Sequence, residues 1–334
     1  MKPPSKPRNP SRAKQAKVPP AVNVVCFSGG RTSGYMLHKL IQQHGIDTIR
    51  NEWKVLFANT GRERNETLDF VRDVEVNWGV PIVWLEYTRV KAEQWIVDTY
   101  SHPNSKRAVL EDMKTPEGMT HWFRAVDWAS AKRIGDEALP FDEMLDWMNV
   151  LPNVRGRGCT GQLKVRTMTR YLLSLGHASW SDNIGIRADE SDRSIEIKAK
   201  SPKHVTPKFP LIDAGVNEAE VLDFWKRQSF NLQLQSYEGN CDLCFLKSRE
   251  KKHRLIQENP GSVDWWKWRE WKMKMKLKTP GDGAVFRKAH EYERLEREAS
   301  SAVLPEYTRD DITPISCGCF DGGHESVDLS EAAK

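Results

Sequence analysis

The sequence predicts an α/β fold in which a parallel, doubly wound sheet carries a helical insertion and a cysteine-bearing helical C-terminal region. Two observations favour this class. Short apolar runs, typical of strands buried on both faces, alternate with segments of helical spacing. Polar turns follow several of these runs, and ligands of such sheets bind outside the carboxyl ends of the strands. The sequence therefore predicts a binding site among these turns.

The first half of the chain predicts three strands and two helices. The apolar run 21–27 predicts a buried strand, and a helix begins within 33–43. Residues 53–59 predict a second strand, 65–79 a helix and 81–87 a third strand. This alternation of strands and helices indicates a parallel sheet.

The middle of the chain holds a long insertion. Residues 92–158 are rich in Trp, Met and acidic residues, and we expect mainly helices that cover the sheet. A fourth strand is predicted over 183–190. Further on, Asn217 with Glu220 three residues later predicts the start of a helix, because this spacing is that of a capping box.

Three more helical stretches are predicted near the C-terminus, at about 246–258, 262–278 and 284–301. The expected organisation has four parts, listed here in order: a disordered basic leader (1–20), a nucleotide-binding α/β domain (21–235), the cysteine-bearing helical region (236–325) and an acidic tail (326–334).

The net charge of +5 comes from the leader. Residues 1–20 carry six basic residues and no acid, which leaves −1 for the other 314 residues. The net charge therefore does not by itself indicate nucleic-acid binding. No apolar run approaches the roughly 20 residues of a membrane span, and the leader lacks the apolar segment of a secretory signal. We expect a cytoplasmic protein, and in such a reducing compartment clustered cysteines bind metal or do chemistry more often than they pair.

A small-residue turn joins the first strand to the first helix. Two glycines let the backbone approach an anion, and the helix N-terminus adds free N–H groups and partial positive charge. The turn therefore predicts phosphate binding, with an ordinary strand-to-helix turn as the alternative. It is not a Walker A loop, because the Gly-Lys-Ser/Thr ending is missing. Its residues are Ser28, Gly29, Gly30, Arg31, Thr32 and Ser33.

SGGRTS resembles the PP-loop of the adenine nucleotide α-hydrolase-like superfamily. The chain is similar, more narrowly, to the phosphoadenosine phosphosulfate (PAPS) reductase family, including its phage-type and DNA-phosphorothioation relatives. Five further segments within 22–250 carry the resemblance: NTGRERNETLDFV (59–71), CTGQLKVRTMTRYL (159–172), GIRADESDR (185–193), FPLID (209–213) and GNCDLCFLKS (239–248). The resemblance implies a Rossmann-like PP-loop enzyme that binds ATP or a PAPS-like adenine nucleotide and acts in adenylation, sulfur transfer or redox chemistry.

The resemblance also implies a nucleotide-binding turn after the second strand and an anion-contacting lysine. A solvated, charged loop is the alternative. We expect Arg31, Arg62 and Lys164 to hold phosphates and to stabilise the charge of the transition state. The residues concerned are Thr60, Gly61, Arg62, Glu63 and Lys164.

Four charged residues at the end of the predicted fourth strand suit an anion clamp, or equally a surface salt-bridge cluster. They are Arg187, Asp189, Glu190 and Arg193. The PP-loop usually has an acidic residue at the position that Thr32 occupies here. We therefore expect Asp189 and Glu190 to supply a catalytic carboxylate, and Mg²⁺ is a further candidate cofactor.

Cys26 lies inside the first strand, where a buried structural role is favoured. The other five cysteines fall at spacings that suit one soft metal centre. We expect a [4Fe–4S] cluster, with zinc or free thiols as alternatives. The expected ligands are Cys159, Cys241, Cys244 and Cys319, and Cys317 is left as a catalytic thiol.

Two other functions stay open. One is thiol-dependent reduction of PAPS to sulfite, and the other is a non-catalytic module that senses nucleotides or binds nucleic acid. The Trp- and Lys-rich segment 265–278 bears on the second, since 245–278 carries +7. A helix over this segment has two apolar faces, which favours a helix packed between neighbours over one that contacts nucleic acid or a partner. One face carries Trp268, Trp271 and Met275, and the other carries Trp266, Met273 and Leu277. A nucleic-acid or sulfur-carrier acceptor and a homo-oligomer are further open partners.

Overall fold

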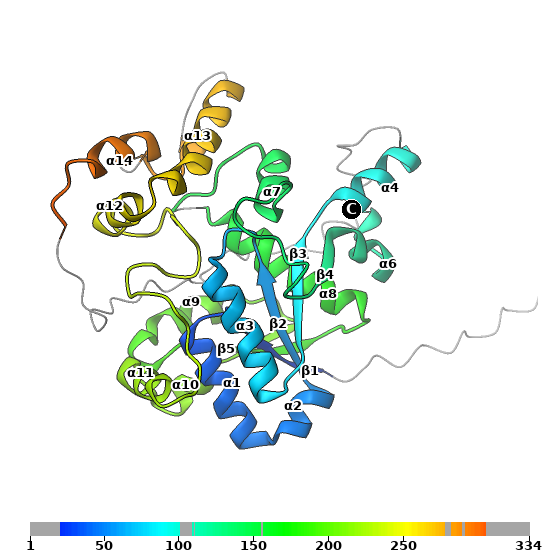
Figure 1. Ribbon diagram of the computed structural model, residues 1–334. Coiled ribbons are helices and arrows are strands. Elements are labelled where there is room, and N and C mark those ends of the chain that lie inside the picture. Colours follow the sequence, from blue (N-terminus) through cyan, green and yellow to red (C-terminus); the bar gives the residue numbers. More distant parts are fainter. Residues whose placement is uncertain are drawn as a thin grey trace, which may run out of the picture.

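The computed structural model describes residues 21–100, 109, 111–154, 156–277, 282–288 and 291–304. Its centre is a six-stranded sheet with the order β4-β3-β2-β1-β5-β6 (Figure 1). Five strands are parallel, and the edge strand β4 runs antiparallel to β3. The strands are β1 (Val22–Cys26), β2 (Lys54–Asn59), β3 (Ile82–Tyr87), β4 (Phe123–Val126), β5 (Trp180–Ile184) and β6 (Val205–Lys208). The prediction of an α/β fold is confirmed.

The first three predicted strands are confirmed as β1, β2 and β3, and the predicted helix over 65–79 as α3 (Asn65–Trp78). Helix α1 (Arg31–His44) begins inside the small-residue turn rather than after it, and α2 (Ile46–Glu52) follows it. Glycine ends both longer helices: Gly45 follows α1 and the left-handed Gly79 follows α3. Local sequence signals therefore set these boundaries.

The prediction of the fourth strand over 183–190 was wrong in position. The strand is β5, and residues 188–190 form a short 3₁₀ turn. Strand β5 was missed because its middle is polar, yet Asp182 and Asn183 are buried. The Asn183 amide donates to the Val24 carbonyl (2.9 Å), so that it bonds to the neighbouring strand. Strands β4 and β6 were also missed, because both are short edge strands with few buried residues and β6 contains Pro207.

Both faces of the sheet are covered. Along β1, Val25 packs in one apolar cluster with α1, α3 and α11 (Glu218–Lys226). Its neighbours Val24 and Cys26 point the other way, into a cluster with α8 (Thr167–Ser174) and α9 (Asp192–Lys200). This alternation is the one expected of a strand buried on both faces. The buried position of Cys26 agrees with its expected structural role.

The insertion is only partly helical. It contains α4 (Val90–Tyr100), α6 (Pro116–Met119), the 3₁₀ turn η1 (Thr120–Trp122) and α7 (Pro140–Met148), but also strand β4, which extends the sheet. It ends just before η2 (Cys159–Arg166), a π-helix. The prediction of a mainly helical insertion therefore missed the edge strand.

The C-terminal region is helical, as predicted. The expected capping box of Asn217 and Glu220 opens α11, and α10 (Pro210–Asp213) precedes it. Then come α12 (Arg249–Glu258), η4 (Pro260–Val263), α13 (Asp264–Lys276), η5 (Asp282–Ala284) and α14 (Tyr292–Ala299), which share a third apolar core with α7. Within the described residues, the longest apolar stretches of helix fall short of what crossing a membrane requires.

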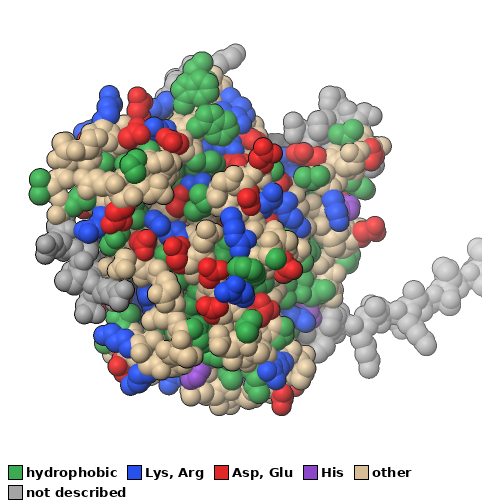
Figure 2. Space-filling model, viewed as in Figure 1, with side chains coloured by type: hydrophobic (Ala, Val, Ile, Leu, Met, Phe, Trp, Pro, Cys, Tyr) green, Lys and Arg blue, Asp and Glu red, His purple; other side chains and the backbone are tan. Residues whose placement is uncertain are grey.

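Helix α13 is not sandwiched between neighbours. Trp266 and Met273 are buried in the third core, but the opposite face is open: Trp268 is 45 %, Trp271 59 % and Met275 71 % exposed. Figure 2 shows a group of hydrophobic side chains at the top of the molecule, over α13. The prediction was wrong for this face because nothing in the described part of the chain covers it.

Candidate functional site

The sheet has its topological switch point between β1 and β5. The chain goes outward from β1 through β2 to β3, then returns to place β5 and β6 on the other side of β1. The loops that follow β1 and β5 meet there: a Cβ on Gly185 would lie 3.1 Å from the Cα of Ser33. Ligands of open α/β sheets bind at such a point, outside the carboxyl ends of the strands.

The loop after β1 has the geometry of an anion cradle. Gly29 has a φ of +74°, which favours glycine, and a Cβ there would lie 2.7 Å from Thr67 Cγ2. The Ser28 N–H donates to Ser33 Oγ (3.2 Å), which fixes the turn. Gly30 is the N-cap of α1, without a capping side chain, and the first turn of α1 contains no acidic residue. The partial positive charge at this end of the helix is therefore not offset by a carboxylate of the helix's own first turn.

The cysteine-bearing segment is fastened to this loop. The Asn240 amide donates to the Ser28 carbonyl (2.9 Å). The Arg64 N–H donates to the Asn240 carbonyl (2.8 Å), and Glu63 forms an isolated antiparallel bridge with Cys241. Segments about 210 residues apart in sequence thus meet, and Cys241 is one residue from the contact with the loop Ser28–Ser33.

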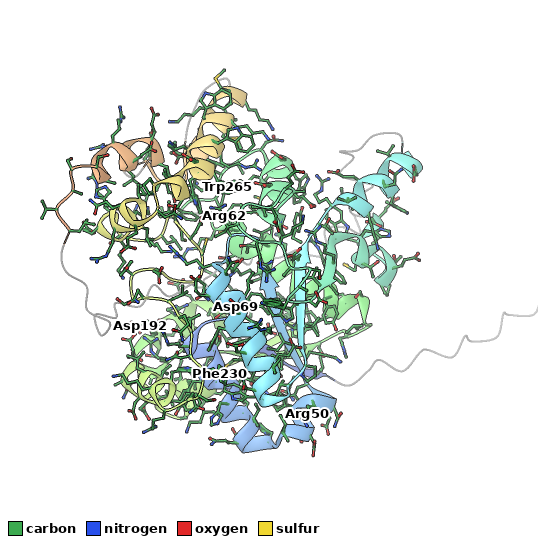
Figure 3. All side chains as sticks on the ribbon, in the orientation of Figure 1. Arg50, Arg62, Asp69, Asp192, Phe230 and Trp265 are labelled. Carbon is green, nitrogen blue, oxygen red and sulfur yellow. The ribbon has the colours of Figure 1, made fainter. Side chains whose placement is uncertain are left out.

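Two arginines expected to hold phosphates have protein partners. Arg31 Nε donates to Asn231 Oδ1 (3.0 Å), and its Nη2 donates to two backbone carbonyls of the same segment. Arg62 is buried, forms an ion pair with Asp242 and lies 4.5 Å from the ring centre of Trp265. Figure 3 labels Arg62 and Trp265. Both guanidinium groups tie the C-terminal half of the chain to the sheet edge, and their phosphate role stays a prediction.

The turn after β2 and Lys164 come together around one carboxylate. Glu63 Oε2 accepts hydrogen bonds from the N–H (2.7 Å) and the hydroxyl (2.6 Å) of Thr60. Lys164, carried by η2, forms an ion pair with Glu63 Oε1 (3.2 Å). Gly61 has a φ of +77°, and a Cβ there would lie 3.0 Å from Pro140. The predicted residues are therefore neighbours, held as a buried polar unit.

The charged residues after β5 form the salt-bridge cluster that the sequence left as the alternative. Arg187 pairs with Asp189 (3.0 Å) and Glu190 (3.3 Å), and Arg193 pairs with Glu190 (2.8 Å). The hydrogen bond from Arg187 lowers the pKa of Asp189. Arg187 also donates to Thr32 Oγ1 (3.4 Å), which links this cluster to the loop Ser28–Ser33. The salt-bridge cluster thus lies at the switch point, with its charges paired.

Three cysteines lie in the same region of the described chain. The Cys241 thiol donates to Cys244, and this bond, with nearby Lys247, lowers the pKa of Cys244. Burial and the neighbouring Cys244 raise the pKa of Cys159 to about 12. Among the described residues, no three His, Cys, Asp or Glu side chains are placed to hold a metal ion. Cys317 and Cys319 lie outside the described residues, so the expected cluster stays a prediction.

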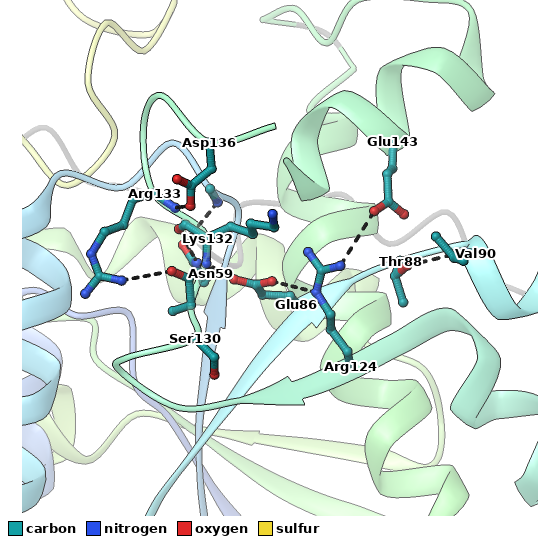
Figure 4. Close-up of polar contacts among 12 residues, drawn as sticks. Asn59, Glu86, Thr88, Val90, Arg124, Ser130, Lys132, Arg133, Asp136 and Glu143 are labelled. Atoms are coloured by element: carbon teal, nitrogen blue, oxygen red, sulfur yellow. Dashed lines mark hydrogen bonds and ion pairs between the residues drawn. The ribbon is translucent and has the colours of Figure 1, made fainter. Parts of the chain in front are cut away.

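A polar unit at the ends of β2 and β3 was missed by sequence analysis. Buried Glu86 accepts hydrogen bonds from the Asn59 amide (2.6 Å), the Lys132 N–H (2.6 Å) and Arg124 Nε (2.7 Å), and Arg124 also pairs with Glu143 (3.8 Å), as Figure 4 shows. This group of hydrogen bonds and ion pairs connects the insertion to the carboxyl edge of the sheet.

Two residues of the switch point were missed as well. Asn240 directly precedes the first cysteine of the C-x₂-C pair, and Gly185 directly follows β5. Both positions fall within segments that carried the resemblance, which was the available signal. Their contacts with Ser28 and Ser33 are long-range, so local patterns could not predict them.

Fold and site together define an α/β protein with a candidate ligand site at the switch point of its sheet. No family model matches the chain. Over 245 residues the chain is 30% identical to the uncharacterized nin region protein ORF290 of Escherichia phage lambda, a match that covers 72% of this chain and 71% of the phage protein. The chain therefore belongs to the family of that phage protein.

Proposed function

We propose that the chain is a PP-loop enzyme of the PAPS reductase type, which binds ATP or a related adenine nucleotide at Ser28–Ser33 and acts in adenylation or sulfur transfer. The observation that carries the proposal is the meeting of the loops after β1 and β5 at the switch point, beside the uncapped N-terminus of α1. The motif resemblance supplies the adenine nucleotide as the ligand.

The residues of the loop have different roles in the proposed reaction. The backbone N–H groups around Gly29 and Gly30 hold the phosphates, and the positive end of α1 stabilises the charge that develops in the transition state. An acceptor attacks the α-phosphorus, the bond from that phosphorus to the bridging oxygen breaks, and pyrophosphate leaves. Arg187 holds the Thr32 hydroxyl in place beside the loop.

The position of the cysteines supports a sulfur-handling acceptor. Cys241 adjoins Asn240, whose side chain contacts the phosphate loop. A [4Fe–4S] cluster held by Cys159, Cys241, Cys244 and a terminal cysteine belongs to the proposal as a prediction. The cysteines among the described residues do not by themselves form a metal-binding group. The iron content and visible spectrum of anaerobically purified protein test it, and a colourless, iron-free protein contradicts it.

Pyrophosphate release from ATP, measured with candidate thiol and nucleic-acid acceptors, tests the enzymatic proposal. Gly30→Val is the variant of choice, because Gly30 has an extended backbone (φ −107°, ψ 161°) that valine adopts, and the nearest atom to a Cβ there is 3.5 Å away. We expect the variant to fold and to lose activity. Gly261→Ala is the control, since the φ of Gly261 is not positive and the nearest atom to a Cβ there is 3.9 Å away. Equal rates in the wild type and Gly30→Val would contradict the proposal.

A further inference from the structure

A second group of basic side chains lies at the carboxyl end of β3, two strands from the phosphate loop and so roughly 10 Å along the sheet edge. It is built from five elements. Tyr87 ends β3, Arg89 precedes α4, Trp122 belongs to η1, Trp147 to α7 and Arg170 to α8. All but Trp147 are buried.

Both arginines stack on the same indole. The guanidinium carbon of Arg170 lies 5.1 Å from the ring centre of Trp122 and 5.9 Å from that of Tyr87. The guanidinium carbon of Arg89 lies 5.6 Å from Trp122 and 4.9 Å from Trp147. Aromatic rings thus hold the two planar groups near each other, and like charges near each other are unfavourable without an anion between them.

Part of the hydrogen-bonding capacity of these groups is unused. Within the described chain, Arg170 Nη1, Arg89 Nε and Nη2, and the Tyr87 hydroxyl are buried and have no hydrogen-bond partner. Burying a donor without a partner is costly, and a buried charge without a partner costs more. The donors belong to β3, the loop before α4 and α8, and Arg89 is close enough to Arg170 to act on its charge.

One of the two nearby carboxylates pairs with Arg89, and neither acts on Arg170. Glu93 pairs with Arg89 Nη1 (3.0 Å) and is half exposed. Glu143 accepts the Arg89 backbone N–H (2.9 Å) and pairs with Arg124. Among the described residues, the titratable groups that act on Arg170 are Tyr87, Arg166 and Arg89, and none is a carboxylate. Burial lowers the pKa of Arg170 to about 10, so the guanidinium remains charged at neutral pH.

We propose that Arg89 and Arg170, with the Tyr87 hydroxyl, form a second oxyanion site that takes a phosphate or sulfate group. Arg89 Nε and Nη2, Arg170 Nη1 and the Tyr87 hydroxyl are donors that suit the oxygens of a tetrahedral anion. Glu93 balances part of the Arg89 charge, and Arg170 supplies a positive charge without a carboxylate partner among the described residues. The anion is either a free ion or an anionic group of the nucleotide bound at the phosphate loop. The site is separate from the loop, and its existence does not depend on the proposed reaction.

The test is thermal unfolding of the full chain in low-millimolar sodium sulfate, compared with sodium chloride at equal ionic strength. We expect sulfate to raise the unfolding temperature of the wild type along a saturating curve, because a ligand that binds the native state stabilises it. The Gly30→Val variant, whose phosphate loop is blocked, keeps the saturating rise. Arg170→Met loses it, and without sulfate this variant unfolds no earlier than the wild type, since an unpaired buried charge has been removed.

Two further variants separate binding from folding. Arg227→Met removes an exposed arginine that pairs with Asp223, and it keeps the sulfate response of the wild type. Arg89→Lys keeps the charge but loses the planar fork, so its apparent Kd for sulfate rises about tenfold. The proposal is overturned if sulfate and chloride act alike on the wild type and on Gly30→Val, or if Arg170→Met responds to sulfate as the wild type does.

Calorimetric titrations with ATP distinguish a free anion from an anionic group of the nucleotide. An ATP affinity at least tenfold weaker in Arg170→Met than in the wild type assigns the site to an anionic group of the nucleotide. An unchanged ATP affinity, together with a lost sulfate response, assigns it to a free anion. Either result supports the site. A wild type that binds sulfate but not ATP refutes the proposed function and leaves this site standing.

Discussion

Asp182 is a buried carboxyl in the middle of β5. Burial raises its pKa from 3.8 to about 7. Between these two pH values the folded chain holds a proton that the unfolded chain has lost, so the free energy of unfolding falls as pH rises through this window and levels off above it. The shift of about three pKa units corresponds to up to about 4 kcal/mol.

We predict that Asp182→Asn flattens this dependence, because the amide stays neutral at every pH. Urea unfolding at pH 5 and pH 8 measures it: the loss of stability between the two is smaller in the variant than in the wild type. Part of the pH dependence of the free energy of unfolding remains, since burial also raises the pKa of Glu270 to about 7. The exposed Asp47→Asn is the control and keeps the full slope. Equal slopes in Asp182→Asn and the wild type would contradict the assignment.

Asn240 acts on the phosphate loop through one hydrogen bond to the Ser28 carbonyl. We predict that Asn240→Ala weakens ATP binding about fivefold, because losing one hydrogen bond that orders the loop costs about 1 kcal/mol. Calorimetric titration measures the change. Asn77→Ala removes a comparable side-chain bond, to the Asp73 carbonyl on the surface of α3, and leaves the affinity unchanged. Identical affinities for both variants would show that the contact is only structural.

Helix α13 offers the same substitution on two faces. Trp266 is buried in the third core, whereas Trp271 is 59 % exposed. We predict that Trp266→Ala lowers the free energy of unfolding by about 3–5 kcal/mol, because it opens a cavity among aromatic rings. Trp271→Ala changes it by less than about 1 kcal/mol. Urea unfolding of the two variants side by side tests this, and equal losses would mean that the exposed face is covered in solution.

The elements that the sequence predicted correctly have strong local signals. Strands β1 and β3 are apolar runs of the length of one strand, and α11 is marked by its capping box. Strand β5 was misplaced because Asp182 and Asn183 are buried in spite of being polar. Their burial depends on partners in β1, and no local pattern encodes them.

At the scale of the whole molecule, the sequence predicted which turns meet better than it predicted the contacts of their side chains. Turns at the strand ends were predicted to gather at one sheet edge, and the loop of Ser28 and Ser33 does meet the segment of Arg187. The partners of Arg31 and Arg62, by contrast, lie in segments 180 or more residues away. Spacing along the chain carries no information about such contacts. The oxyanion group of Arg89 and Arg170 escaped prediction for the same reason.

We propose that the loop at the switch point binds an adenine nucleotide, and isothermal titration of ATP into the wild type, Gly30→Val and Gly261→Ala tests this binding. We expect one binding event per chain for the wild type and for Gly261→Ala, and no measurable heat for a folded Gly30→Val. Absence of ATP binding in the wild type, or equal affinity in Gly30→Val, would contradict nucleotide binding at this loop.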